Sequence, residues 1–145
     1  MDPLIVREVT DQASIERIFS LRNDVFVQEQ KVDPSEEFDG LDDAAVQIGA
    51  YQGDVLVGCG RISFIGGRAK LERIAVLSPF RRMGIGAKIL QHMIAIAEGL
   101  GYIDLYLHSQ TAVIAFYERH GFIPEGDVFI EAEIPHRRMV LERRV

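Results

Sequence analysis

The chain is poor in cysteine, lacks tryptophan and has no long apolar run, and these absences exclude several classes of protein. Its 145 residues include one cysteine, Cys59. A single cysteine excludes an internal disulfide framework and a zinc site built from cysteine ligands. No apolar run approaches the ~20 residues of a membrane-spanning helix, and the start at Met1 lacks the basic and apolar regions of a secretory signal. We therefore expect a cytoplasmic protein without a membrane partner.

An excess of positive charge is also missing. The formal net charge is -6 at pH 7, which argues against a nucleic acid partner, because such proteins usually present a basic face. The acidic residues crowd into one short segment, which contains Asp33, Glu36, Glu37, Asp39, Asp42 and Asp43. The pattern leaves two interpretations open: a solvated loop, or an acidic mouth that attracts a cationic substrate.

The hydrophobic residues, 48% of the chain, follow patterns typical of one globular domain over residues 1–145. Periodicity and turn residues predict strands at Leu4–Val9, Ala44–Tyr51, Val55–Ile65, Ala69–Val76, Tyr102–Ser109, Phe122–Pro124 and Arg137–Glu142. They predict helices at Asp11 to about Val27, Gly84 to about Glu98, and Thr111–His120. The resulting β-α-β-β-β-α-β-α-β order indicates an α+β fold, a mixed sheet with helices on both faces.

The most informative stretch leads from the predicted strand Ala69–Val76 into the following helix. Arg81 and Arg82 precede Gly84 and Gly86, where the helix begins. Glycines let a ligand approach the backbone, and the first N–H groups of a helix have no partner inside it and favour an anion. The stretch has neither the third glycine of a dinucleotide site nor the Gly-Lys-Ser/Thr of a Walker loop. We expect it to hold another phosphorylated ligand.

The same stretch resembles the GNAT N-acetyltransferase superfamily. Arg81 to Gly86 matches the family's Arg/Gln-x-x-Gly-x-Gly/Ala signature, and Leu71–Val76 resembles the strand that precedes it. Ala115–Phe122 resembles a second hallmark, a helix that carries a tyrosine and ends in Gly-Phe. Leu21–Gln30 and Ile134–His136 are similar to the ElaA-like branch. The resemblance implies a mostly antiparallel central sheet of six to seven strands, and the exposed sheet edges of this family make a homodimer possible.

The resemblance also implies that acetyl-CoA is bound at this stretch. Its pyrophosphate would lie on backbone N–H groups of Arg82, Met83, Gly84, Ile85, Gly86 and Ala87, with the Arg81 and Arg82 side chains in support. Its pantetheine arm would pair with Ile74, Ala75 and Val76, and the Val76 N–H would polarise the thioester carbonyl. Gln110 stands where many relatives have an asparagine that contacts the cofactor. Most relatives have glycine where this chain has Arg82.

Three residues are candidates for proton transfer. Tyr117 matches the family tyrosine that protonates the departing thiolate, a role that suits a phenol. For the base, Glu72 could act directly or through a water, or could instead be a cross-strand partner of an arginine such as Arg61. His108, on the polar face of its strand, is the other candidate, with a structural role as the alternative. Arg22, Glu29 and Gln30 fall where the family closes its acceptor pocket.

Together these features predict an acetyl-CoA-dependent N-acetyltransferase, with no metal site. A primary amine, from a small molecule or a lysine side chain, would attack the thioester directly in a ternary complex. The alternatives are a non-catalytic acyl-CoA-binding or regulatory domain, and an interaction module that uses the acidic segment.

Overall fold

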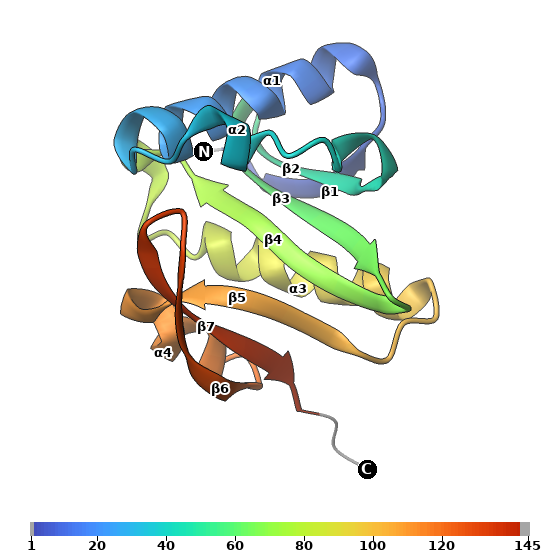
Figure 1. Cartoon of the computed structure of the whole chain (residues 1–145). Helices are drawn as coiled ribbons and strands as arrows, with labels where there is room; N and C mark the ends of the chain where they lie inside the picture. Colours follow the sequence, from blue (N-terminus) through green and yellow to red (C-terminus); the bar gives the residue numbers. More distant parts are fainter. Residues whose placement is uncertain (1, 143–145) are drawn as a thin grey trace.

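The computed structural model describes residues 2–142, within which seven strands form one sheet in the order β1-β2-β3-β4-β5-β7-β6 (Figure 1). The strands are β1 (Leu4–Val9), β2 (Val46–Gln52), β3 (Val55–Ile65), β4 (Arg68–Val76), β5 (Leu105–Gln110), β6 (Phe122–Glu131) and β7 (Ile134–Leu141). Neighbouring strands run antiparallel except β4 and β5, which run parallel. The predicted α+β fold with a mostly antiparallel sheet is confirmed.

Helices cover both faces of the sheet, as predicted. On one face lie α1 (Gln12–Arg22), its π-helical continuation η1 (Asn23–Glu29) and α2 (Pro34–Glu37), and behind the other lies α3 (Ile85–Gly99) (Figure 1). Helix α4 (Ile114–Glu118) packs into the same core as α3. Short 3₁₀ turns are η2 (Asp42–Ala44), η3 (Ser78–Phe80) and η4 (Thr111–Val113). Within residues 2–142, the helices are too short or too polar to cross a membrane.

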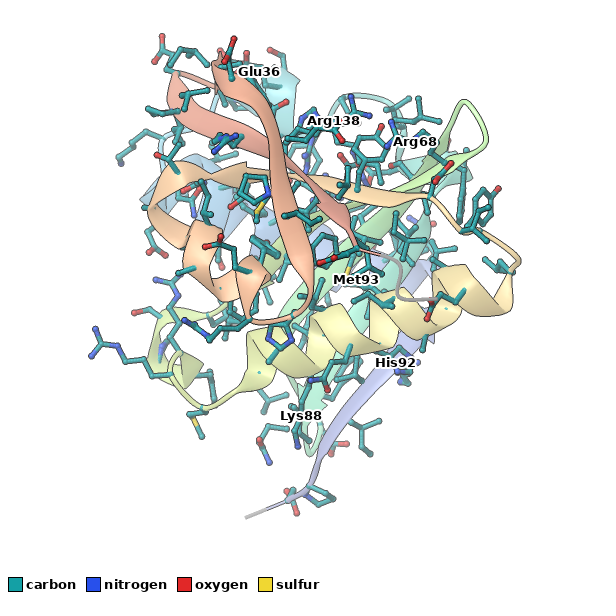
Figure 2. The ribbon with its side chains drawn as sticks, turned by 90° about the horizontal axis from the view of Figure 1, so that it is seen from below. Glu36, Arg68, Lys88, His92, Met93 and Arg138 are labelled. Carbon is teal, nitrogen blue, oxygen red and sulfur yellow. The ribbon has the colours of Figure 1, made fainter. Side chains whose placement is uncertain are left out.

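The two faces of the sheet each carry an apolar core. Helix α3 buries a stripe at helical spacing, Ile85, Ile89, Met93 and Ala97, against residues of β3, β4 and β5. Figure 2 shows Met93 turned toward the sheet and Lys88 and His92 turned away from it. The smaller core under α1 contains Val9, Ile18, Leu21, Val25, Tyr51, Cys59 and Ala75.

Helix α3 packs closely over a glycine of β3. A Cβ atom at Gly60 would lie 2.5 Å from the Met93 Sδ atom and 3.1 Å from Ile89 Cγ2. A larger residue at this position would therefore require the Met93 and Ile89 side chains of α3 to shift.

The C-terminal hairpin is longer than the sequence predicted. Strands β6 and β7 extend through the region between Pro124 and Arg137, where the sequence pattern predicts no strand. Proline is tolerated in β6 because β6 is the edge strand, and a bulge between Glu125 and Phe129 bends it. The hairpin turns at Ala132 and Glu133, both with positive φ (52° and 64°), so the usual glycine signal of such a turn is absent.

Half of the acidic segment is held in ion pairs and half is exposed. Glu37, Asp39 and Asp42, together with Glu72 of β4, are bound by Arg22, Arg61 and Arg73 in what we call the arginine network. The expectation of a solvated loop or an open acidic mouth is corrected for these three carboxylates of the segment, whereas Asp33, Glu36 and Asp43 are exposed. Arg22 Nε lies 2.6 Å from Glu37 Oε2, and its Nη1 lies 2.6 Å from Asp42 Oδ1. The network fastens α2 and η2 to α1, β3 and β4.

The network shifts the acidity of its carboxyl groups. Hydrogen bonds from Arg61 hold the pKa of Asp39 well below its usual range. Burial alone would raise the pKa of Asp42 and Glu72, but the neighbouring arginines outweigh it and both pKa values are lowered. Glu37 is the exception, because burial dominates and raises its pKa. For three of the four carboxyl groups, the folded protein therefore favours the charged form more than the unfolded chain does.

Replacing Arg61 by glutamine is expected to lower the free energy of unfolding at neutral pH by about 3–5 kcal/mol, since it leaves buried carboxylates short of a cation. In the native protein, the lowered pKa values of Asp39, Asp42 and Glu72 contribute stability above about pH 4 that is lost as the pH falls through the folded values. The stability difference between Arg61→Gln and the native chain should therefore shrink toward about pH 3. Guanidinium chloride unfolding measures both effects, with Arg17→Gln on the exposed face of α1 as the control. Equal stability of Arg61→Gln and the native chain at neutral pH would contradict the expectation.

Candidate functional site

The central feature of the site is an opening in the sheet between β4 and β5. Within the described residues these strands pair only at Ala69–Leu105 and Lys70–Tyr106. Beyond that point β4 stays with β3 and β5 stays with β7, so the two diverge toward their carboxyl ends (Figure 1). The unpaired edges carry backbone N–H and C=O groups that need partners.

The backbone of Val76, at the end of β4, is directed into this opening. The Leu77 N–H donates to the Val57 carbonyl at 2.9 Å, so Gly58 and Val76 form the non-hydrogen-bonded type of antiparallel pair. In such a pair the N–H and C=O groups point away from the partner strand. The Val76 carbonyl accordingly accepts from Arg81 Nε at 2.8 Å on the side away from β3.

A bulge in β4 lies just before this point. Arg73 and Ile74 together face Gly60, and Arg73 has a left-handed φ of 57°. Such a bulge increases the local twist and redirects side chains. It turns Arg73 toward α2, where its guanidinium lies 3.1 Å from a Glu37 oxygen, and leaves Ile74 lining the opening.

The loop between β4 and α3 presents unpaired N–H groups. Gly84 is the residue before the helix, with a φ of 77° and no side-chain cap, and the first helical bond runs from the Lys88 N–H to the Gly84 carbonyl at 3.2 Å. The N–H groups of Ile85, Gly86 and Ala87 thus have no partner within the helix. Arg82 also has a positive φ, 65°. The loop can bind an anion through its backbone.

Two side-chain ties connect this region to η1. Arg81 contacts both carboxylate oxygens of Glu29, at 2.6 and 2.8 Å, and Gln110 Nε2 donates to Gln30 Oε1 at 3.0 Å. Arg81 was predicted to support a bound diphosphate and Glu29 to lie at the acceptor pocket. In the structure the two side chains bind each other. The ties place the end of η1 across the opening, against β4 on one side and β5 on the other.

A cavity of about 470 Å³ occupies the opening on the face covered by α1 and α2. Six of the predicted site residues line it: Gln30, Glu72, Ile74, His108, Gln110 and Tyr117. Arg22 does not. Its side chain is fully buried in the arginine network, so the expected contact with an acceptor is corrected to a structural role.

Charged side chains of both signs lie on the cavity-bearing face. Figure 2 shows Glu36, Arg138 and Arg68 on the side of the sheet away from α3. Both guanidinium groups stack on the Tyr106 ring, with centroid distances of 4.4 and 4.6 Å. Glu36 is exposed and lines the cavity.

The candidate catalytic side chains have distinct surroundings. Tyr117 packs among Phe116 and Phe122, and burial raises the pKa of Tyr117 to about 12. Glu72 pairs with Arg61, as its structural interpretation required, and also accepts from Ser63 Oγ at 2.6 Å. His108 Nδ1 lies 3.0 Å from Glu131 Oε1.

Comparison with known proteins identifies the family. Residues 15–122 match the Acetyltransferase (GNAT) family. The chain belongs to this family. YjcF of Bacillus subtilis (strain 168), an uncharacterized N-acetyltransferase, is 35% identical over 131 residues, 90% of this chain and 94% of YjcF.

Solved structures share the GNAT fold. Escherichia coli ElaA has a TM-score of 0.85 at 25% identity, and the match covers 98% of this chain and 100% of ElaA. A GNAT family acetyltransferase from Elizabethkingia anophelis, solved with acetyl-CoA bound, has a TM-score of 0.72 at 20% identity, covering 97% and 96%. The predicted resemblance to GNAT proteins, ElaA included, is confirmed.

Glu131 is the site residue that sequence reasoning missed in this GNAT chain. It is the last residue of β6, in a region where the sequence pattern predicts no strand, and the hairpin tip that carries it lies beside the ends of β4 and β5 (Figure 1). The signal that could have found it is its position just before Ile134–His136, a segment already matched to ElaA-like proteins. Lys70, from the predicted strand Ala69–Val76, lines the same cavity.

Two alanine substitutions in the GNAT loop are expected to differ although the chemical change is the same. Gly84→Ala should cost about 1–2 kcal/mol of stability, because its left-handed φ is unfavourable for any residue with a Cβ. Gly86→Ala should be neutral or stabilising by up to about 1 kcal/mol, since a Cβ there meets Phe116 at an ordinary 3.8 Å and alanine favours a helix. Chemical denaturation of both variants measures the difference. Equal effects would show that the loop does not require the conformation described.

Proposed function

We propose that this GNAT protein is an acetyl-CoA-dependent N-acetyltransferase that transfers the acetyl group to a primary amine by direct attack in a ternary complex. The observation that carries the proposal is the opening between β4 and β5, with the Val76 N–H directed into it and an uncapped helix N-terminus at its end. A backbone edge beside an anion-binding loop suits a ligand with an amide arm and a diphosphate.

The residues of the opening fit acetyl-CoA. The N–H groups of Arg82 to Ala87 would hold the diphosphate, and the edge of Ile74 to Val76 would pair with the pantetheine amides as an added strand does. Arg81 is occupied by Glu29, so its contribution is to fix the loop rather than to bind phosphate. Gln110, tied to Gln30, would lie beside the cofactor on the β5 side.

The chain's own groups would supply the catalysis. Bound acetyl-CoA supplies the activated acetyl group as a thioester. The Val76 N–H would donate to the carbonyl oxygen on which negative charge develops. Tyr117, whose pKa burial raises to about 12, is protonated at neutral pH, as any phenol is, and it would donate its proton to the departing sulfur. Holding both reactants in one cavity contributes further through orientation.

The charge of the cavity favours a cationic amine as acceptor, on a small molecule or a lysine side chain. Glu37, Asp39 and Glu72 are neutralised by the arginine network. Glu131 also lines the cavity but is paired with His108, whereas Glu36 is exposed there. Glu36 is therefore the carboxylate that would attract an ammonium group.

Acetyl-CoA at about 100 times its Kd is expected to stabilise the protein by about 2.7 kcal/mol and to raise Tm, whereas NAD and ATP should not. Met83→Glu should weaken acetyl-CoA binding about tenfold, because it adds a carboxylate to the exposed loop where the diphosphate would lie. Gln91→Glu, which adds the same charge to the exposed side of α3, is the control. Equal stabilisation by NAD would overturn the cofactor assignment.

Tyr117→Phe is expected to slow acetyl transfer by about 10²-fold or more while acetyl-CoA affinity changes less than about twofold, because the ring remains and only the proton donor is lost. Release of free thiol with a panel of primary amines measures turnover, and calorimetry measures affinity. Tyr102→Phe, outside the cavity, is the control. Full activity of Tyr117→Phe would remove its acid role. Tight acetyl-CoA binding without thiol release from any amine would favour a non-catalytic acyl-CoA-binding domain.

A further inference from the structure

The cavity contains a histidine–carboxylate pair, His108 and Glu131, and the sequence motifs did not indicate that these two residues interact. His108 projects from β5 with a side chain 23% exposed, and Glu131 reaches it from the tip of the β6–β7 hairpin. Phe129 packs its ring against His108 with a centroid distance of 4.9 Å, edge to face. The pair is thus held by a hairpin bent over the opening, and both residues line the cavity.

The carboxylate fixes which nitrogen of His108 carries the proton. An ionised Glu131 can only accept a hydrogen bond, and its Oε1 lies 3.0 Å from Nδ1. The neutral imidazole therefore keeps its proton on Nδ1, and Nε2 carries the free lone pair. A base needs that lone pair together with a partner that stabilises the charge formed when it takes a proton.

The surroundings keep Glu131 ionised. The hydrogen bond from His108 lowers the pKa of Glu131, and the charges of His108, Lys70 and His136 add to the effect. His136 contacts the Ile134 carbonyl through Nδ1 at 2.7 Å, and its Nε2 lies 3.7 Å from the second Glu131 oxygen.

Glu72, the other candidate base, is engaged elsewhere. Its Oε2 accepts from Arg61 Nε at 2.8 Å and from Ser63 Oγ at 2.6 Å, and its Oε1 lies 3.4 Å from Lys70 Nζ. Burial would raise its pKa, but Arg61 outweighs this and the pKa is lowered. A carboxylate with both oxygens bound to cations and a lowered pKa is a weak base. Its function is to hold the arginine network.

We infer that His108 is the proton acceptor for the attacking amine and that Glu131 is the residue that positions it. This assignment rests on the proposed acetyl transfer. The ammonium group of the acceptor first loses one proton to solvent, which frees the lone pair of its nitrogen. His108 Nε2 then takes a second proton from that nitrogen as it bonds to the acetyl carbon. The carbon–sulfur bond breaks, its electron pair stays on sulfur, and sulfur takes a proton from Tyr117. His108 then returns its proton to solvent and Tyr117 regains one, which restores both groups.

The kinetic test uses graded changes at Glu131, because its side chain is exposed and can be replaced without disturbing the core. With an amine that the native protein accepts, Glu131→Leu should lower kcat about 10–100-fold, and Glu131→Gln, which can still accept from Nδ1, should recover part of that loss. The KM for acetyl-CoA should stay within about twofold in both. Glu133→Gln, the neighbouring exposed carboxylate, should match the native protein. A native kcat in Glu131→Leu, or a loss confined to KM, would overturn the positioning role.

A spectroscopic test separates this inference from the proposed function. In the ¹⁵N spectrum of the native protein, with His108 assigned by its absence in His108→Gln, the neutral ring should be the Nδ1–H tautomer. In Glu131→Leu the ring should shift toward the Nε2–H tautomer. An Nε2–H tautomer in the native protein would overturn the inference whether or not any amine is acetylated. Absence of thiol release from every amine, with the Nδ1–H tautomer present, would instead count against the proposed function.

Discussion

The whole site depends on the divergence of two parallel strands. β4 and β5 share two residue pairs and then leave each other, and a sheet does not open in this way without support, because each exposed backbone group needs a partner. The support comes from both sides. β7 pairs with β5 along the length of β5, and β3 remains paired with β4 on both sides of the bulge at Arg73 and Ile74. The opening is therefore rigid, and the unpaired backbone groups along β4 can form hydrogen bonds with an extended ligand, as a neighbouring strand would.

The arginine network determines what closes over that opening. η1 continues α1 as a π-helix, and Arg22 at their junction fastens the acidic segment that follows. Arg61 and Arg73 fasten the same segment to β3 and β4. A single set of buried charges therefore joins the sheet to the chain that covers the acceptor side. Its desolvation is costly, which is tolerable only because nearly every charged group in it has several partners.

Sequence patterns predicted the parts of the fold in which one physical signal dominates. Strand Val55–Ile65 is a long β-like run, and the helix after the glycine pair carries a long apolar stripe; the structure has both as expected. The differences lie where contacts between residues far apart in the sequence decide the structure. The sequence pattern predicts no strand between Pro124 and Arg137, but pairing with β7 extends β6 through Pro124 and Gly126, which an edge position and a bulge accommodate. The acidic segment was not predicted to be buried because its arginine partners, Arg61 and Arg73, lie far along the chain. A local sequence pattern does not reveal ion pairs between such distant residues.

The same limit applies to the site itself. The loop and Tyr117 could be found from sequence because they are local motifs, whereas the choice between Glu72 and His108 depends on which cations and carboxylates reach them in space. Both stand on polar positions of neighbouring strands, and only their partners differ. Arg61 binds the Glu72 carboxylate, and Glu131 leaves the His108 imidazole with a free lone pair. A residue's capacity to accept a proton is thus a property of its partners, and in this protein those partners come from β3 for Glu72 and from β6 for His108.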